Sequence, residues 1–195
     1  MTKTALTILI PFSLLLASCG GAPSTPSASA APAPAVGSSG STGGQGGSVP
    51  SAGDQTMSAQ EAQVLKEVNE ARAQARSCGG QAFAAAPAVT WNGYLAASAR
   101  GHATDMAARA YFDHNTPEGR TPAQRMEAAG YSSWRQVGEN IAAGYTVQNV
   151  VQGWIDSPSH CKTLMDPGLK ELGVGYTYRQ GSPYGTYWVQ NFGTR

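Results

Sequence analysis

The chain has 195 residues, with 13 Lys and Arg against 12 Asp and Glu, which gives a formal net charge of +1. This balance, without any run of basic residues, excludes the electrostatic footprint of a nucleic-acid-binding protein and strong electrostatic docking on a membrane. Composition divides the chain into three segments, residues 1–18, 19–56 and 57–195, which differ in hydropathy and in charge.

Residues 1–18 have the features of a bacterial export signal. Lys3 supplies a positive charge, and the apolar run from Ala5 to Leu16 is too short to span a bilayer comfortably. Leu16-Ala17-Ser18-Cys19 resembles the lipobox of bacterial lipoproteins, in which the cysteine is lipid-modified and becomes the mature N-terminus. We therefore predict a lipoprotein signal peptide and lipidation at Cys19, which would anchor the protein to a membrane. An ordinary secretory signal is the alternative.

Residues 19–56 are predicted to be a disordered tether. They consist almost entirely of Gly, Ser, Ala, Pro, Thr and Gln, with Asp54 as the only charged residue. Such a segment has too little apolar bulk to offset the entropy lost on ordering. As a random coil it would span on the order of 35 Å and carry a domain clear of the membrane surface.

Residues 57–195 are predicted to form one folded domain. Aromatic, aliphatic and charged residues are all present here, together with all four Trp of the chain. Once Cys19 is assigned to lipid, Cys78 and Cys161 remain as a pair, and disulfides persist in exported proteins. We therefore expect a Cys78–Cys161 disulfide that closes a loop of about 80 residues. Two free thiols are the alternative.

Capping signals and apolar residues at helical spacing predict four helices in this domain. Ser58 and Glu61 have the spacing of a capping box, and Thr121 and Gln124 repeat it. Pro158 is expected to interrupt the fourth helix and to leave the residues after it in a loop. The helices are expected over residues 58–77, 93–110, 121–130 and 146–157.

Strands are predicted late in the domain. The segments rich in β-branched and aromatic residues are Trp134–Ile141, Leu172–Tyr178 and Tyr187–Phe192. A turn around residues 181–185 would join the last two as a hairpin. Because helices come first and strands cluster late, the pattern favours an α+β fold over a parallel α/β sheet.

The titratable candidates are the three histidines and Glu139. His102 lies on the apolar stripe of the second predicted helix, where a histidine is more often a satisfied core residue than a ligand. His114 follows the exit of that helix, and His160 lies in the predicted loop beside the disulfide. Glu139 sits in an otherwise apolar strand, so its carboxylate must be exposed or paired. Spacing alone does not bring His114, Glu139 and His160 together.

Five short motifs follow one another along the domain. They are Phe112-Asp113-His114 with Gly119-Arg120-Thr121-Pro122 and Arg125, then Gly138-Glu139-Asn140-Ile141-Ala142, Trp154-Ile155-Asp156-Ser157-Pro158-Ser159-His160, Leu172-Gly173-Val174-Gly175, and Tyr187-Trp188-Val189-Gln190-Asn191-Phe192-Gly193. Each motif is weak alone, but their order is specific. In this order they resemble the CAP superfamily (cysteine-rich secretory proteins, antigen 5 and pathogenesis-related 1), in its bacterial SCP-like branch, and the resemblance covers about Glu61 to Gly193.

The resemblance implies an α-β-α sandwich, with a small central antiparallel sheet flanked by helices and a surface cleft. In many members the cleft holds two histidines and two acidic residues. The histidines match His114 and His160 in this chain, and one of the acids matches Glu139. The second acid has no clear match. Asp156 is the only carboxylate between Trp154 and His160, and Ser157 is the other candidate for that position.

If His114, Glu139 and His160 converge, they would suit a divalent metal such as Zn²⁺ with an open coordination position. Such a site could hold a lipid headgroup or a peptide carboxylate, or activate water for hydrolysis. Without a metal, Glu139 would set the tautomer of a histidine in a polar pocket.

We favour a non-catalytic, monomeric domain at the bacterial cell envelope, lipid-anchored or secreted, whose cleft binds an envelope protein, lipid or peptide. The alternatives are a metal-dependent hydrolase acting on peptide or envelope material and a structural interaction domain with a vestigial cleft. A serine hydrolase built on Ser157 is disfavoured, because Ser157 precedes Pro158 and the chain has no Gly-x-Ser-x-Gly elbow.

Overall fold

The structure is a computed structural model that describes residues 56–195. The predicted signal peptide, Cys19 and the predicted tether up to residue 55 lie outside the described residues. The elements in chain order are α1 (Ala59–Arg72), β1 (Arg76–Cys78), β2 (Gln81–Phe83), β3 (Thr90–Trp91), α2 (Gly93–Arg109), α3 (Pro122–Ala128), β4 (Gln136–Ala143), α4 (Val150–Asp156), α5 (Pro158–Met165), β5 (Glu171–Tyr178) and β6 (Thr186–Thr194).

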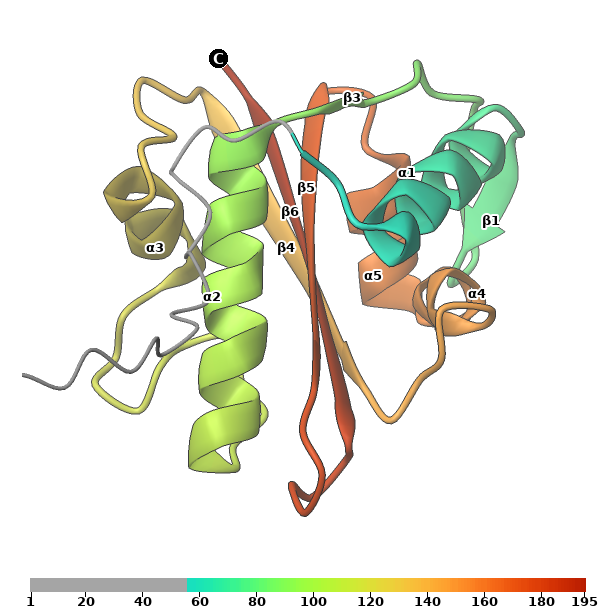
Figure 1. Ribbon diagram of the computed structural model, residues 1–195. Helices are drawn as coiled ribbons and strands as arrows, with labels where there is room; N and C mark the ends of the chain where they lie inside the picture. The colour runs from blue at the N-terminus through green and yellow to red at the C-terminus, as the bar shows by residue number, and fades with distance from the viewer. Residues whose placement is uncertain (1–55) are drawn as a thin grey trace, which may run out of the picture. The chain divides into compact units, whose positions relative to one another are not determined.

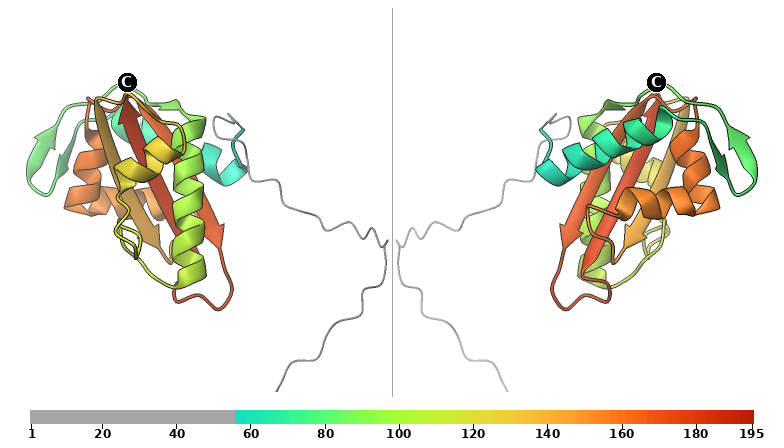
Figure 2. Two further views of the ribbon diagram at one scale, coloured as in Figure 1. Left: turned by 90° about the vertical axis from the view of Figure 1, so that its left-hand side faces the viewer. Right: turned by 90° about the vertical axis from the view of Figure 1, so that its right-hand side faces the viewer.

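A four-stranded sheet forms the middle layer of the domain, in the order β3-β5-β6-β4. Helices α2 and α3 cover one face of the sheet, and α1, α4 and α5 cover the other (Figures 1 and 2). The pairs β4–β6 and β5–β6 are antiparallel, and only the two-residue strand β3 pairs in parallel, with β5. The predicted α+β sandwich is therefore confirmed, with one short parallel strand added at the sheet edge. No helix within residues 56–195 has both the length and the apolar character needed to span a bilayer.

The first helix is shorter than predicted, because the chain turns back into a hairpin after it. Helix α1 ends at Arg72, and β1 and β2 pair around Gly79 and Gly80, whose φ angles of 60° and 86° suit a tight turn. The predicted disulfide is confirmed: Cys78 on β1 bonds Cys161 on α5, with 5.5 Å between their Cα atoms. The hairpin is thereby fixed to the α5 layer.

The predicted loop position of His160 is wrong, because Pro158 begins a helix instead of ending one in a loop. Ser157 is both the C-cap residue of α4 and the N-cap residue of α5, and Pro158 is the first residue of α5. Proline is favoured there, since the first helical N–H has no partner within the helix and the ring already has a helical φ. His160 therefore lies on a helix. At the other end, α4 starts at Val150 and not at the predicted Thr146.

Helix α2 packs against the backbone of β5 because two glycines of that strand leave room for it. A Cβ atom at Gly173 would lie 2.0 Å from the nitrogen of Ala96, and one at Gly175 would lie 2.3 Å from the carbonyl carbon of Ala99. Both separations are shorter than any real contact, so these positions require glycine. This close packing fixes α2, and with it the segment after α2 that carries His114.

Candidate functional site

The site is built around Glu139 on β4, whose side chain is only 2% exposed. Its Oε2 accepts a hydrogen bond from Nη2 of Arg125 at 2.6 Å, and its Oε1 accepts one from Nδ1 of His114 at 2.9 Å. A buried carboxylate needs this kind of pairing to offset the loss of its hydration. The expectation that Glu139 is exposed or paired is confirmed, and the pairing holds the guanidinium of Arg125 and the imidazole of His114 at one point of the sheet.

Arg125 positions both the carboxylate and the loop that leads to α3. It lies in the last turn of α3, and its Nη1 donates to the main-chain carbonyls of His114 at 2.7 Å and Arg120 at 3.0 Å. The predicted capping box at Thr121 is present and starts this helix. Arg125 belongs to the first of the five motifs, but the sequence did not predict a role for it. The one indication was that Glu139, if buried, would need a partner.

His114 presents one side of its ring to solvent, with its side chain 47% exposed. Because an ionised carboxylate only accepts, Nδ1 of His114 carries the hydrogen of the bond to Glu139. Nε2 is then left for a ligand, as an acceptor on the neutral ring and as a donor on the charged ring. The hydrogen bond to Glu139 therefore places the hydrogen of a neutral His114 ring on Nδ1.

His102 is a buried structural residue, as expected for the apolar stripe of its helix. It is 1% exposed, and its Nε2 donates to the main-chain carbonyl of Asp113 at 2.9 Å, which ties α2 to the segment carrying His114. Burial lowers the pKa of His102, the charge of Arg125 lowers it further, and Glu139 opposes the shift. The imidazole is held neutral and acts as a strut.

His160 lies on α5 and is half-buried. Its main-chain carbonyl accepts a hydrogen bond from Nδ2 of Asn140 at 3.1 Å, and Asn140 directly follows Glu139 on β4. Burial lowers the pKa of His160, and the positive charge of His114 lowers it further. The two imidazoles therefore influence each other electrostatically, although only His114 bonds the carboxylate.

Asp156 and Ser157 are not joined to this group. Asp156 is exposed at the end of α4, and its carboxylate accepts a hydrogen bond from Nε2 of Gln152 at 2.7 Å on the same helix. Ser157 links α4 to α5. Among residues 56–195, no hydrogen bond or ion pair connects either side chain to Glu139 or to the histidines. The second side chain bonded to Glu139 is the guanidinium of Arg125.

A cavity of about 290 Å³ opens beside His114 and Glu139. Its remaining walls come from the start of α3 and from β4, and they are mostly apolar: Thr121, Pro122, Ala123, Met126, Val137 and Gly138. The site thus combines a half-exposed imidazole and a buried ion pair with a small apolar wall. This suits a ligand with one polar end and a short apolar part.

The donor set fits the predicted Zn²⁺ site poorly. Both oxygens of Glu139 already accept hydrogen bonds, one from Arg125 and one from His114, so a metal would have to displace one of these side chains to reach the carboxylate. Within the described part of the chain, no three His, Cys, Asp or Glu side chains are grouped as metal ligands. Binding of Zn²⁺ by His114, Glu139 and His160 stays a prediction, and two imidazoles are the donors left free for it.

Comparisons with known proteins give the family. The model of the Cysteine-rich secretory protein family, CAP, matches residues 65–192. The uncharacterized protein YkwD of Bacillus subtilis is 37% identical over 99 residues, which are 50% of this chain and 36% of YkwD. An extracellular protein of Bacillus anthracis that contains an SCP domain is 28% identical, with a TM-score of 0.57 over 70% of this chain and 40% of that one.

A third similarity concerns the fold alone. An outer surface protein of Borrelia burgdorferi has a TM-score of 0.60 at 21% identity, over 73% of this chain and 98% of that one. The chain spans less than half of the length of YkwD and of the Bacillus anthracis protein. Since the family model covers well over half of the chain and includes every residue of the site, the chain belongs to the cysteine-rich secretory protein (CAP) family.

Proposed function

We propose that this protein is a membrane-tethered, extracytoplasmic CAP domain that binds a ligand without catalysis, through the cleft at His114 and Glu139. The observation that carries the proposal is the state of Glu139, whose side chain is buried and whose two oxygens are both engaged. A carboxylate held in this way orients His114 and does not act as a free base or nucleophile.

The location is supported by the N-terminal sequence and by the relatives. Residues 1–19 resemble a lipoprotein signal, and the similar proteins include an extracellular protein with an SCP domain. The disulfide between Cys78 and Cys161 is typical of proteins that fold outside the reducing cytosol. We expect the domain to work as a monomer on its tether, within reach of envelope proteins, lipids or peptides.

The chemistry of the cleft favours an anionic ligand group. When His114 is protonated, Nε2–H is a charge-assisted donor on the exposed side of the ring, while Nδ1–H stays on Glu139. The apolar wall formed by Pro122, Met126 and Val137 would take a short apolar part of the same ligand. A phosphate headgroup or a carboxylate carries the required charge.

A titration with sn-glycerol 3-phosphate tests this function. The imidazole ¹H–¹⁵N resonances of His114 should shift saturably in the wild-type protein and in Asp156→Asn, which lies outside the site. The shift at the cleft should be lost in His114→Ala. Absence of saturable shifts around His114 would contradict phosphate binding at the cleft, and acetate in place of the phosphate would then test the carboxylate.

Zn²⁺ titration by calorimetry tests the competing metal-dependent hydrolase. We expect no stoichiometric binding that depends on both His114 and His160. Micromolar binding that is lost in folded His114→Ala and in folded His160→Ala, but kept in Asp156→Asn, would overturn the non-catalytic proposal and require a search for hydrolytic substrates.

A further inference from the structure

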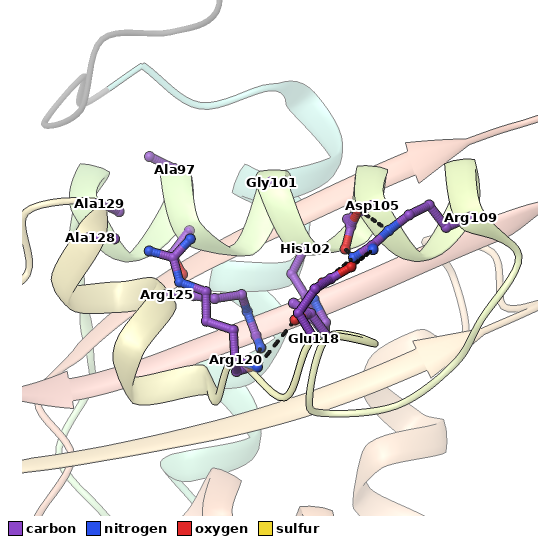
Figure 3. A pocket seen from close by; sticks show the side chains of 12 residues that line it. Ala97, Gly101, His102, Asp105, Arg109, Glu118, Arg120, Arg125, Ala128 and Ala129 are labelled. Carbon is purple, nitrogen blue, oxygen red and sulfur yellow. Dashed lines mark hydrogen bonds and ion pairs between the residues drawn. The ribbon is translucent and has the colours of Figure 1, made fainter.

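A second cavity, of about 670 Å³, lies between α2 and the segment from Thr116 to Ala129 (Figure 3). Its volume falls within the range of small-molecule and peptide sites, about 300–1,000 Å³. The cavity does not include His114, Glu139 or His160, so it is distinct from the cleft described above. Arg125 alone belongs to both places, since it lines this cavity and bonds Glu139.

Small residues on both sides keep this cavity open. Ala97 and Gly101 line it from α2, and Ala128 and Ala129 line it from the end of α3. A Cβ atom at Gly101 would meet no atom within 4 Å, so this helical glycine faces open space. Short side chains on both helices allow the backbone of an extended ligand to approach closely, as bulky ones would not.

Two buried donors in the cavity wall have no acceptor. Ser98 is 6% exposed and Arg125 is 8% exposed, and both line the cavity. Among the described residues 56–195, the hydroxyl oxygen of Ser98 and Nε of Arg125 have no hydrogen-bond partner. Nη1 and Nη2 of Arg125 already bond two carbonyls and Glu139, so Nε is the nitrogen of this guanidinium that has no partner among residues 56–195. Buried donors normally have partners, so these two indicate an acceptor that a ligand would supply.

The charges along the cavity are unevenly balanced. At one end Arg109 bonds both Asp105 and Glu118, and its hydrogen bond lowers the pKa of Glu118 to about 2, so the two acids there stay ionised and paired (Figure 3). Arg120 also lines the cavity, and its guanidinium has no ion pair or hydrogen bond within residues 56–195. Two carboxylates on one guanidinium leave the Arg109 end with a net charge of −1, and Arg125 is paired with Glu139, so the unpaired positive charge of the cavity wall lies with Arg120.

We propose that this cavity binds the free carboxylate end of a short peptide with small side chains. Nε of Arg125, the hydroxyl of Ser98 and the guanidinium of Arg120 would supply the donors for the carboxylate. The paired groups at Arg109, Asp105 and Glu118 would face the peptide backbone, which offers both donors and acceptors. An acyl chain would leave these polar groups without partners, so a lipid tail is the poorer occupant.

The test uses N-acetyl-Ala-Ala-Ala as the probe and its C-terminal amide as the matched control, titrated into the purified full-length chain and followed by ¹H–¹⁵N spectra. The free acid should bind saturably, and the amide should bind at least about tenfold more weakly, because it lacks the charge. Equal affinity of acid and amide, or no saturable binding of the acid, would overturn the proposal.

Three variants place the binding in this cavity. Gly101→Met fills open space and should abolish binding, and Arg120→Gln should weaken binding about tenfold. Arg179→Gln makes the same change at an exposed arginine outside the cavity and should leave affinity unchanged. Ser98→Ala should weaken binding while raising the thermal midpoint of the free protein, because it removes a buried hydroxyl without a partner. Affinity unaffected by both Gly101→Met and Arg120→Gln would show that the peptide binds elsewhere.

Discussion

The two faces of the central sheet each bury one arginine, and the two arginines are used differently. Under α1, α4 and α5, Arg72 is fully buried and donates only to main-chain carbonyls, those of Pro87, Leu164, Asp166 and Leu169. Under α2 and α3, Arg125 is also buried, but it bonds the carboxylate of Glu139 and keeps Nε without a partner among residues 56–195.

The difference separates a scaffold from a site. Main-chain carbonyls do not titrate and are a fixed part of the fold. Arg72 therefore acts as a structural clamp between the end of α1 and the chain around α5 at any pH. Arg125 instead bonds a carboxylate that also bonds the half-exposed imidazole of His114, and its unpaired Nε lies in the wall of a cavity. The hydrogen bonds of Arg125 can therefore change when a ligand binds. Incompletely satisfied polar groups concentrate where a protein trades stability for function.

The disulfide should account for the largest single share of stability on the α1 face. It closes a loop with a sequence separation of 83, and removing that constraint from the unfolded chain costs about 4–5 kcal/mol in the chain-entropy model. Cys78→Ala combined with Cys161→Ala should lower the free energy of unfolding by that amount, measured by denaturant titration. Reduction of the wild-type protein should reproduce the loss, and a loss below about 1 kcal/mol would show that this face does not depend on the bridge.

Replacing Arg72 tests the clamp. Arg72→Met should lower the free energy of unfolding by about 4 kcal/mol, because several buried carbonyls lose their donor at about 1–3 kcal/mol each. The site should be unaffected, so the imidazole resonances of His114 should match those of the wild-type protein. Arg179→Met, at an exposed position, serves as the control. A shifted His114 spectrum would show that the two faces are coupled.

Much of the architecture is written locally in the sequence. The capping boxes at Ser58 and Thr121 involve residues close together in the chain, and the pairing of Cys78 with Cys161 follows by elimination once Cys19 is assigned to lipid. The structure contains both capping boxes and the disulfide. The prediction that a loop follows Pro158 was wrong because proline is compatible both with ending a helix and with starting one. Only the fold, by placing Ser157 at the junction of α4 and α5, decides between them.

The site depends on tertiary contacts that no spacing rule supplies. Glu139 on a strand, Arg125 on a helix and His114 on a loop meet because α3 packs beside β4. The sequence predicts that Glu139 needs a partner if it is buried. It does not indicate which of the 13 Lys and Arg residues is that partner. The cavity beside Arg120 depends on the same packing, so composition contained no signal for it.

Breaking the pair at Glu139 should cost less than removing Arg72, and should alter the site. Arg125→Met leaves the carboxylate with His114 alone and should lower the free energy of unfolding by about 3 kcal/mol. In the double variant Arg125→Met with Glu139→Gln the losses should be subadditive by about 1–2 kcal/mol, because no buried charge remains unpaired. Denaturant titrations of the four proteins give the coupling. Full additivity would show that the pair contributes nothing beyond its separate contacts.

The smallest predicted effect is a dependence of the free energy of unfolding on pH, caused by His102 on α2 and His160 on α5. The pKa values of His102 and His160 are lowered, chiefly by burial, so below the ordinary histidine pKa of about 6.5 the unfolded chain binds protons that the folded protein does not. Stability is therefore fully present above that pH and falls as the pH drops through it, by at most about 1.4 kcal/mol per pH unit for each histidine.

His102→Gln separates the contribution of the buried strut from that of the site, since glutamine can still donate to the carbonyl of Asp113 but does not titrate. Unfolding measured at several pH values between about 5 and 7.5 should give a shallower slope in His102→Gln than in the wild-type protein. His160→Gln should flatten the slope less, because His160 is only half-buried whereas His102 is enclosed. Equal slopes in all three proteins would mean that neither imidazole is held neutral by the fold. In that case the acid sensitivity would arise from the carboxylates, and the contrast between a neutral strut at His102 and a ligand-facing ring at His114 would fail.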